Sequence, residues 1–394
     1  IKPQLTGGNV KPDWQAIIEE ATDFRHALHR QPELTWQEEQ TAVKVRERLD
    51  KLDIAWRACA THGAVATLAP KASGKHVALR ADMDALPINE LTDVPYKSEI
   101  PGCMHACGHD GHTATLWAAA AWLKRHEDKL PGPVSLLFQP AEEGGHGAEK
   151  MIEDGALKGV DEIFGWHNWP MIPFGQAVCP DGAVMSGNGT FHIDIKGKGG
   201  HASQPEINRD PVIAAAAITL NLQQIISRRL PPQSDVVVSV SSINADAFPT
   251  VTPETARIEG SIRLAQPELR SRINELITQI TQDTARTYGV EASVENKPRY
   301  EATINHAGPA QTYRDVLRQE FGDDWQMKSL AIPIMASEDF SYYLNEIPGA
   351  FALIGMAEGD QFQYGCHSPH YQFNDQLLAP VARLYARLAG APLP

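Results

Sequence analysis

The sequence predicts an α/β fold with two domains, and three observations indicate it. Short apolar strands alternate with helical patterns in both outer parts of the chain. The middle part has the order β-α-β-β-α-β, which is typical of a ferredoxin-like unit. The length of 394 residues exceeds that of one ordinary domain. We therefore expect a main domain with a largely parallel sheet flanked by helices, and an inserted ferredoxin-like α+β domain.

The predicted strands of the main domain are short apolar runs that stop abruptly at polar residues, as buried parallel strands do. Helical apolar spacing separates them. The expected strands are 76–81, 134–138, 163–166 and 350–354, and the expected helices are 14–29, 38–52 and 112–126. Because the carboxyl ends of parallel strands meet at one edge of a sheet, the polar residues that follow these runs should gather there.

The middle of the chain reads as a separate compact domain. Its predicted strands are 190–196, 235–243, 255–264 and 290–296, and its predicted helices are 210–229 and 267–288. Asp210-Pro211 supplies an N-cap and a first-turn proline for the earlier helix. We predict an inserted domain from 186 to 297, and a discontinuous main domain made of 1–185 and 298–394.

Composition excludes several classes of protein. The formal net charge of −14 argues against nucleic-acid and anionic-membrane partners. No run of eighteen apolar residues is present, so no membrane span is expected. The five cysteines are an odd number and widely spaced, unlike a disulfide framework. A reducing, cytoplasmic location is the expectation that follows.

The densest cluster of chemically reactive residues is His105-Ala-Cys-Gly-His-Asp-Gly-His112. Thiolate and imidazole at such short spacing are good ligands for zinc or a similar divalent transition metal. Cys107 and His109 would face the same way only in an extended strand-to-helix loop. The alternative is a polar helix-capping loop that contains a buried cysteine.

Two adjacent carboxylates, Glu142 and Glu143, follow the predicted strand 134–138. One of such a pair can bind a metal ion while the other takes a proton from water. A solvated acidic loop is the alternative, although its position after a buried strand makes that interpretation weaker.

Further candidate ligands stand at other predicted strand ends. Asp82 and Asp84 could bind metal directly or orient a ligand imidazole. His167 follows a third strand, and either His367 or His370 could contribute from the last loop. Each histidine alone could equally be an ordinary hydrogen-bonded residue, but all these strand ends should converge on one edge.

Seven segments together resemble the M20 family of metallo-amidohydrolases, in the branch of aminoacylases, hippurate hydrolases and indole-acetyl-amino-acid hydrolases. They occur in the family's order over nearly the whole chain. The segments are RHALHRQPEL (25–34), ALRADMDALPI (78–88), MHACGHDGHTA (104–114), LLFQPAEEGGHGA (136–148), GKGGHAS (197–203), SEDFSYYL (337–344) and CHSPHYQFND (366–375).

The resemblance implies a two-metal site in the main domain, which would then be catalytic. Cys107 would bridge two divalent ions per subunit, zinc, manganese or cobalt, and the other ligands would be His109, Glu143, His167 and His367. Glu142 matches the family's general base, and Asp84 matches a residue that supports the metal site from behind.

The resemblance also makes the inserted domain a lid that forms a homodimer. His201 matches a histidine that the family supplies from the partner subunit to the oxyanion, and Arg263 matches an arginine that holds the substrate carboxylate. The alternative to substrate binding is that Arg263 forms a salt bridge within its sheet. Two departures stand out: Thr250 where the family usually has Asn, and Glu206 where it usually has His. Glu206 could attract a cationic substrate side chain, or could be a rim carboxylate without a ligand.

The expected function is hydrolysis of the amide bond of a small N-acyl amino acid, most simply an N-acetyl one. Segments HRQPELTWQE, PIMASEDFSYYL and ARLAGAPLP are similar to a subgroup that deacetylates N-acetyl-2,4-diaminobutyrate. A dipeptidase with the same site is one alternative. A non-catalytic, metal-stabilised binding protein is the other, although such a protein has no need of a spare base such as Glu142.

Overall fold

The computed structural model describes residues 10–394, which form two compact units. The described part of the first unit comprises 10–184, 304–330 and 339–394, and the second comprises 185–303 and 331–338. The second unit is therefore larger than the predicted insertion 186–297. The added residues pair with the start of the insertion: the Asn188 N–H donates to the Tyr300 carbonyl over 2.8 Å, and the Ser186 N–H to the Ala336 carbonyl over 2.9 Å.

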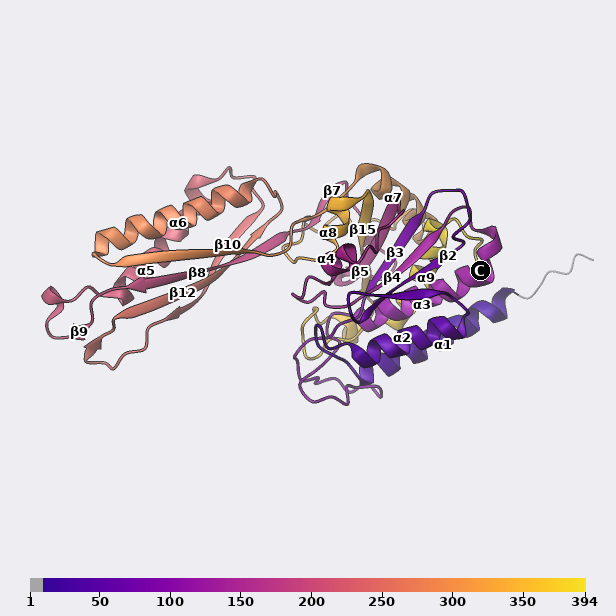
Figure 1. The fold of residues 1–394 in the computed structure, drawn as a ribbon, viewed down its shortest axis with the longest axis horizontal. Helices are drawn as coiled ribbons and strands as arrows, with labels where there is room; N and C mark the ends of the chain where they lie inside the picture. The colour runs from indigo at the N-terminus through magenta and orange to yellow at the C-terminus, as the bar shows by residue number, and fades with distance from the viewer. Residues whose placement is uncertain (1–9) are drawn as a thin grey trace, which may run out of the picture. The chain divides into compact units, whose positions relative to one another are not determined.

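A seven-stranded sheet forms the centre of the first unit, in the order β1-β2-β4-β3-β5-β15-β6 (Figure 1). The middle strands β4, β3, β5 and β15 are parallel, and the pairings at both edges are antiparallel. This confirms the largely parallel sheet. The strands are β1 Trp56–Cys59, β2 Gly63–Leu68, β3 Val77–Asp82, β4 Val134–Gln139, β5 Glu162–Pro173, β6 Ala177–Val178 and β15 Gly349–Ala357.

Helices flank this sheet, and the central one is α3, His109–Arg125. Residues 109–123 of α3 are all buried, because its many alanines let other elements approach from all sides. It packs against α1, α9 and β3. The other helices of the unit are α1 Val10–Arg30, α2 Glu39–Lys51, α4 Gly147–Glu153, α7 Ala307–Phe321, α8 Ser341–Glu346 and α9 Leu378–Leu388. Within residues 10–394, no helix combines the length and apolar character that a membrane crossing requires.

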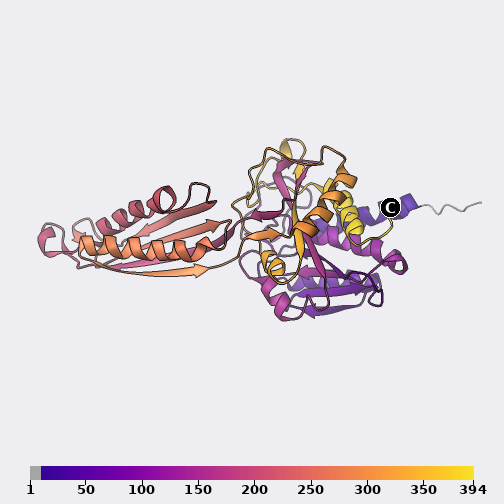
Figure 2. The ribbon, with the colours of Figure 1, turned by 90° about the horizontal axis from the view of Figure 1, so that it is seen from above.

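The second unit has an antiparallel four-stranded sheet in the order β10-β12-β8-β13, with α5 and α6 packed together on one face (Figure 2). Along the chain the order is β8-α5-β10-β12-α6-β13, which confirms the ferredoxin-like prediction. Alternate residues of β8 are buried against the helices. The elements are β8 Gly187–Lys196, α5 Pro211–Leu222, β10 Val236–Asn244, β12 Thr255–Leu264, α6 Leu269–Tyr288 and β13 Glu291–Pro298.

Several element boundaries differ from the prediction, and two of these differences move site residues. Helix α3 begins at His109 rather than at residue 112, so this histidine lies on the first turn. Strand β5 continues to Pro173 because its second half still pairs with β15, so His167 lies inside the strand rather than after its end. Helix α5 ends at Leu222 and is followed by a π-helical turn over Ile225–Arg229, where a single helix was expected.

Candidate metal centre

The candidate centre is built where helix α3 begins. Cys107 lies in the loop directly before α3, and His109 is the first residue of the helix. Gly108 between them has φ +92°, and a Cβ there would lie 2.3 Å from Asn168 Oδ1 and 2.6 Å from the Tyr371 hydroxyl. Only glycine fits a position that is both left-handed and this crowded. The tight turn fixes the directions in which the thiol and the imidazole leave the chain.

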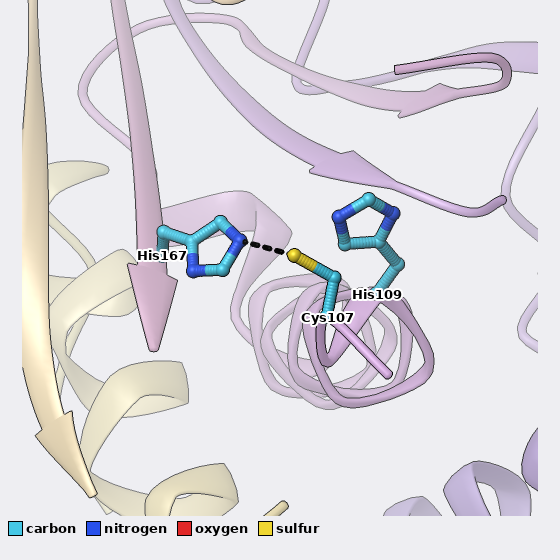
Figure 3. A group of neighbouring side chains, drawn as sticks. All are labelled: Cys107, His109 and His167. Atoms are coloured by element: carbon cyan, nitrogen blue, oxygen red, sulfur yellow. Dashed lines mark hydrogen bonds between the residues drawn. The ribbon is translucent and has the colours of Figure 1, made fainter. Parts of the chain in front are cut away.

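A third donor reaches the same point from strand β5. Figure 3 shows the side chains of Cys107, His109 and His167 gathered around a common space. The distance between Cys107 Sγ and His167 Nε2 is 3.3 Å, and one donor atom from each residue lies within 4.8 Å of the others. All three side chains are buried. Two imidazoles and a thiol at this spacing are a suitable ligand set for a transition metal.

A second group of donors shares the same cysteine. Cys107, Glu143 and His367 also place one donor atom each within 4.8 Å of the others. Glu143 Oε1 lies 3.2 Å from His367 Nε2. His367, with φ +69°, is half-exposed, whereas Glu143 is largely covered. The sulfur of Cys107 therefore belongs to two donor groups at once, which is what a ligand bridging two ions requires.

The donor atoms have the properties of metal ligands. His109 Nε2 and Glu143 Oε1 are buried, and neither has a hydrogen-bond partner among residues 10–394. Burial, together with the neighbouring His112, holds the pKa of His167 well below its usual value, so this imidazole is neutral and can bind a cation. Buried polar atoms without partners are costly unless a bound group satisfies them. These residues fit a metal ion.

Comparison with known proteins agrees with this geometry. Residues 78–391 match the model of peptidase family M20/M25/M40. The chain belongs to the M20 family. This confirms the predicted resemblance, and it identifies the chain as an M20-type amidohydrolase, an enzyme rather than the non-catalytic binding protein that the sequence left open.

Individual relatives of this M20 hydrolase cover nearly its whole length. It is 39% identical over 383 residues to the IAA-amino acid hydrolase ILR1-like 2 of Arabidopsis thaliana, covering 96% of this chain and 84% of the relative. It is 38% identical to the N-acetyl-L-cysteine deacetylase of Bacillus subtilis, covering 89% of this chain and 83% of the relative. A solved structure of a dinuclear metal-binding M20 peptidase from Bacillus subtilis matches with a TM-score of 0.82 and 32% identity, covering 95% and 98% of the two chains.

Asp84 connects three residues of the candidate centre through hydrogen bonds. Its Oδ1 lies 3.2 Å from His109 Nδ1 and accepts the Glu142 N–H over 3.0 Å, and its Oδ2 accepts the Glu143 N–H over 2.9 Å. Burial alone would raise the pKa of the Asp84 carboxyl. The His109 imidazole and these N–H donors outweigh burial, so the pKa of Asp84 lies below its usual value and the carboxyl is ionised. An ionised Asp84 selects the His109 tautomer whose Nε2 is free to bind metal.

Asp82, the other aspartate of the same strand end, orients a different histidine. Its Oδ1 lies 2.6 Å from His112 Nδ1, and His112 Nε2 lies 2.7 Å from Asn168 Oδ1. Both ring nitrogens of His112 are thus used in hydrogen bonds, and Asp82 is also paired with Arg80 over 2.7 Å. Asp82, His109 and His112 also place one donor atom each within 4.8 Å of the others, but both His112 nitrogens are already held by Asp82 and Asn168, so this group supports the fold around the centre.

The remaining histidines of the sequence motifs belong to neither of the two donor groups. His105 is buried, and burial lowers its pKa to about 4. His370 stacks against Tyr364 with ring centroids 5.1 Å apart. His367, in contrast, lies beside Glu143 and belongs to a donor group, so the geometry favours it over His370 as the candidate ligand.

Glu142 lies beside the donors and is held by Asp339, whose role the sequence did not reveal. The Asp339 N–H donates to Glu142 Oε1 over 3.3 Å. The Asp339 carboxylate in turn accepts hydrogen bonds from the Arg80 guanidinium, the Gln139 amide and the Ala148 N–H, each over 2.9 Å. Asp339 is fully buried. The hydrogen bonds to its carboxylate hold Asp339 in place, and its backbone N–H in turn positions the Glu142 carboxylate.

Replacing Asp339 by asparagine should test this positioning role. The new amide would present N–H groups to Arg80, Gln139 and Ala148, which are themselves donors. Residue 339 should therefore move, and its backbone N–H should no longer hold Glu142. We expect kcat to fall about 10- to 100-fold, with KM and metal content little changed. Glu320→Gln is the matched control, because Glu320 is a buried carboxylate paired with Arg383 away from the centre. Equal losses of kcat in the two variants would contradict a specific role for Asp339.

The four predicted substrate-binding and oxyanion residues all belong to the second unit. His201, in β9 (Gly200–His201), pairs with Val251 in β11 (Val251–Thr252), next to Thr250. Glu206 is exposed in a short 3₁₀ turn. Arg263 lies near the end of β12 and donates to Ser337 Oγ over 3.0 Å, so its partner within the unit is a hydroxyl and not the carboxylate of a salt bridge.

Proposed function

We propose that this M20 hydrolase binds two divalent metal ions that share Cys107. His109 and His167 would complete one ligand set, and Glu143 and His367 the other. The proposal rests on one observation, that the Cys107 sulfur belongs to both donor groups. Thiolate and imidazole favour zinc, and manganese and cobalt suit the same ligands, since the order of affinities does not decide occupancy.

The reaction proposed is hydrolysis of an amide bond. Two bound cations would make water more acidic and polarise the amide carbonyl. Glu142 accepts the proton of the attacking water and returns it to the leaving nitrogen. Its position supports both tasks, because it is nearly buried and is held by the Asp339 N–H. Asp84 contributes by orienting His109 and the backbone of both glutamates.

The substrate proposed is a small N-acyl amino acid, with acetyl as the first acyl group to test. The name of the Bacillus subtilis N-acetyl-L-cysteine deacetylase supports this choice. Arg263 would hold the substrate carboxylate through its planar guanidinium. Burial and the nearby Arg299 lower the pKa of Arg263, yet a guanidinium remains charged at neutral pH. N-acetyl-2,4-diaminobutyrate is the specific candidate, and a dipeptide is the alternative substrate.

We also propose that the second unit is a lid and dimerisation domain. His201 of the partner subunit would then donate to the oxyanion. The Ser203 N–H donates to His201 Nδ1 over 3.1 Å, which leaves the proton of the neutral ring on Nε2, as a donor to substrate requires. All five cysteines are free thiols, which fits the predicted cytoplasmic location.

Metal analysis combined with a substrate panel tests the proposed function. Chelation should remove both the metal and the activity, and add-back of zinc, manganese or cobalt should restore them. The restored enzyme should then be assayed on N-acetyl amino acids and on dipeptides. Full activity in the metal-free protein would overturn the two-metal proposal, and faster turnover of dipeptides would replace the substrate assignment.

Glu206 makes a separate prediction about substrate charge. If its carboxylate attracts a cationic side chain, the enzyme should prefer N-acetyl-2,4-diaminobutyrate to neutral N-acetyl amino acids and hippurate. Glu206→Gln should reduce that preference by about 3- to 10-fold in kcat/KM, as a partly exposed charge pair worth about 1 kcal/mol implies. Glu291→Gln, at another exposed position of the same unit, is the control. An unchanged preference in the Glu206 variant would discard the idea.

A further inference from the structure

Cys366 lies immediately before the candidate ligand His367 and is half-exposed, whereas Cys107 is buried. The two cysteines are 259 positions apart in the sequence, yet the two segments run side by side. The His367 N–H donates to the Ala106 carbonyl over 2.7 Å. The residue after one cysteine is therefore bonded to the residue before the other.

This hydrogen bond has a geometric consequence for the two cysteines. The bond holds two segments of the chain together at this point, and Cys107 and Cys366 are the residues that adjoin the two bonded peptide groups. Disulfides join residues whose Cα atoms are about 4.4–6.8 Å apart. The hydrogen bond thus makes Cys107 and Cys366 neighbours, as a disulfide requires.

The two thiols also lie close enough to influence each other, because Cys366, together with burial, holds the pKa of Cys107 well above its usual value. The other cysteines have different surroundings. The Cys59 thiol donates to the Met151 carbonyl over 3.6 Å, and Cys179 Sγ accepts from Asn305 Nδ2 over 3.7 Å. The backbone hydrogen bond and the proximity of the two thiols together single out this pair.

We propose that Cys107 and Cys366 form a reversible disulfide when a peroxide oxidises the metal-free enzyme. The sulfur of the half-exposed Cys366 attacks the O–O bond of the peroxide, giving a sulfenic acid and releasing water when the oxidant is hydrogen peroxide. The Cys107 sulfur then attacks the sulfenic sulfur, and a second water leaves as the S–S bond forms. Two thiols are oxidised and one peroxide is reduced.

The disulfide would compete with metal binding. The thiolate is the form of cysteine that binds metal, so a Cys107 sulfur held in an S–S bond is lost to both donor groups. This consequence rests on the proposed function, whereas the disulfide itself rests only on the proximity of the two cysteines. The bond would also protect Cys107 from irreversible oxidation until metal and a reductant are present.

Peptide mapping of the oxidised protein tests the proposal. The full-length enzyme is treated with a chelator and then with hydrogen peroxide, and its peptides are mapped by mass spectrometry without reduction. We expect one disulfide that joins Cys107 to Cys366, so that two of the five thiols no longer react with a maleimide when the protein is unfolded for labelling. Metal uptake should be lost and should return after dithiothreitol. Enzyme loaded with metal beforehand should form the bond more slowly.

Two variants make the test specific. Cys366→Ser should fold, bind metal and turn over substrate, but should form no reversible disulfide. Cys103→Ala, at a buried cysteine of the same segment as Cys107, should form the Cys107–Cys366 bond as the native enzyme does. A different disulfide, or two thiols that stay unlinked, would overturn the proposal. A Cys107–Cys366 bond with undiminished metal uptake would uphold the disulfide and refute Cys107 as a metal ligand.

Discussion

Replacing Glu142 by glutamine should reduce kcat by about 10²- to 10⁴-fold, the range that a general base contributes. Glutamine has nearly the same size and can still accept the Asp339 N–H through its amide oxygen. It cannot take a proton from water at neutral pH. The variant should therefore keep its metal, its fold and its KM for substrate, and lose the chemical step.

The neighbouring residue supplies the matched control. Glu143→Gln changes a carboxylate of the same loop, but Glu143 Oε1 lies beside His367 Nε2 and belongs to a donor group with Cys107. That variant should lose metal, and added metal should restore part of its activity. Measuring metal content and kcat for both variants separates a base from a ligand. Because Glu142 also lies in a donor group with His109 and Glu143, a loss of metal in the Glu142 variant would make it a ligand instead.

Much of the fold could be predicted because its strands are buried on both faces. The apolar runs that become β3, β4 and β15 have few polar residues, and their polar followers mark where each strand ends. Strands β1 and β2, at one side of the sheet, were not predicted. Strand β1 has only four residues, three of which are not buried, and β2 consists mostly of small residues. Their place in the sheet is decided by the pairing of β2 with β4, a long-range contact.

The site shows the same division between local and long-range information. Strand ends predicted which residues converge, and the pairs Asp84–His109 and Glu142–Glu143 could be foreseen as one cluster. The tertiary structure alone separates the two aspartates, because Asp82 contacts His112 and Asp84 contacts His109. Asp339 was missed as a positioning residue for the same reason. Its partners come from β3, β4 and the first turn of α4, and no local sequence pattern predicts such contacts.

Replacing Cys107 by serine should remove both metal ions together, and with them nearly all activity. The thiol belongs to both donor groups, so its loss takes one ligand from each. A serine hydroxyl of similar size is a poor ligand at neutral pH, since it stays protonated. Single variants of the unshared ligands should behave differently. His167→Ala and His367→Ala should each weaken the binding of one metal ion more than the binding of the other.

Metal stoichiometry is therefore the decisive measurement, rather than activity, which any of these variants would reduce. Each protein would be loaded under the same conditions, and bound metal would be counted per chain by elemental analysis. If the sulfur is shared, the metal content of the Cys107 variant should fall to about zero ions per chain. The His167 and His367 variants should have intermediate metal contents. Cys103→Ala should bind as much metal as the native enzyme. If the Cys107 variant retained one ion, the thiol would serve a single site, and the two donor groups would have to be filled independently.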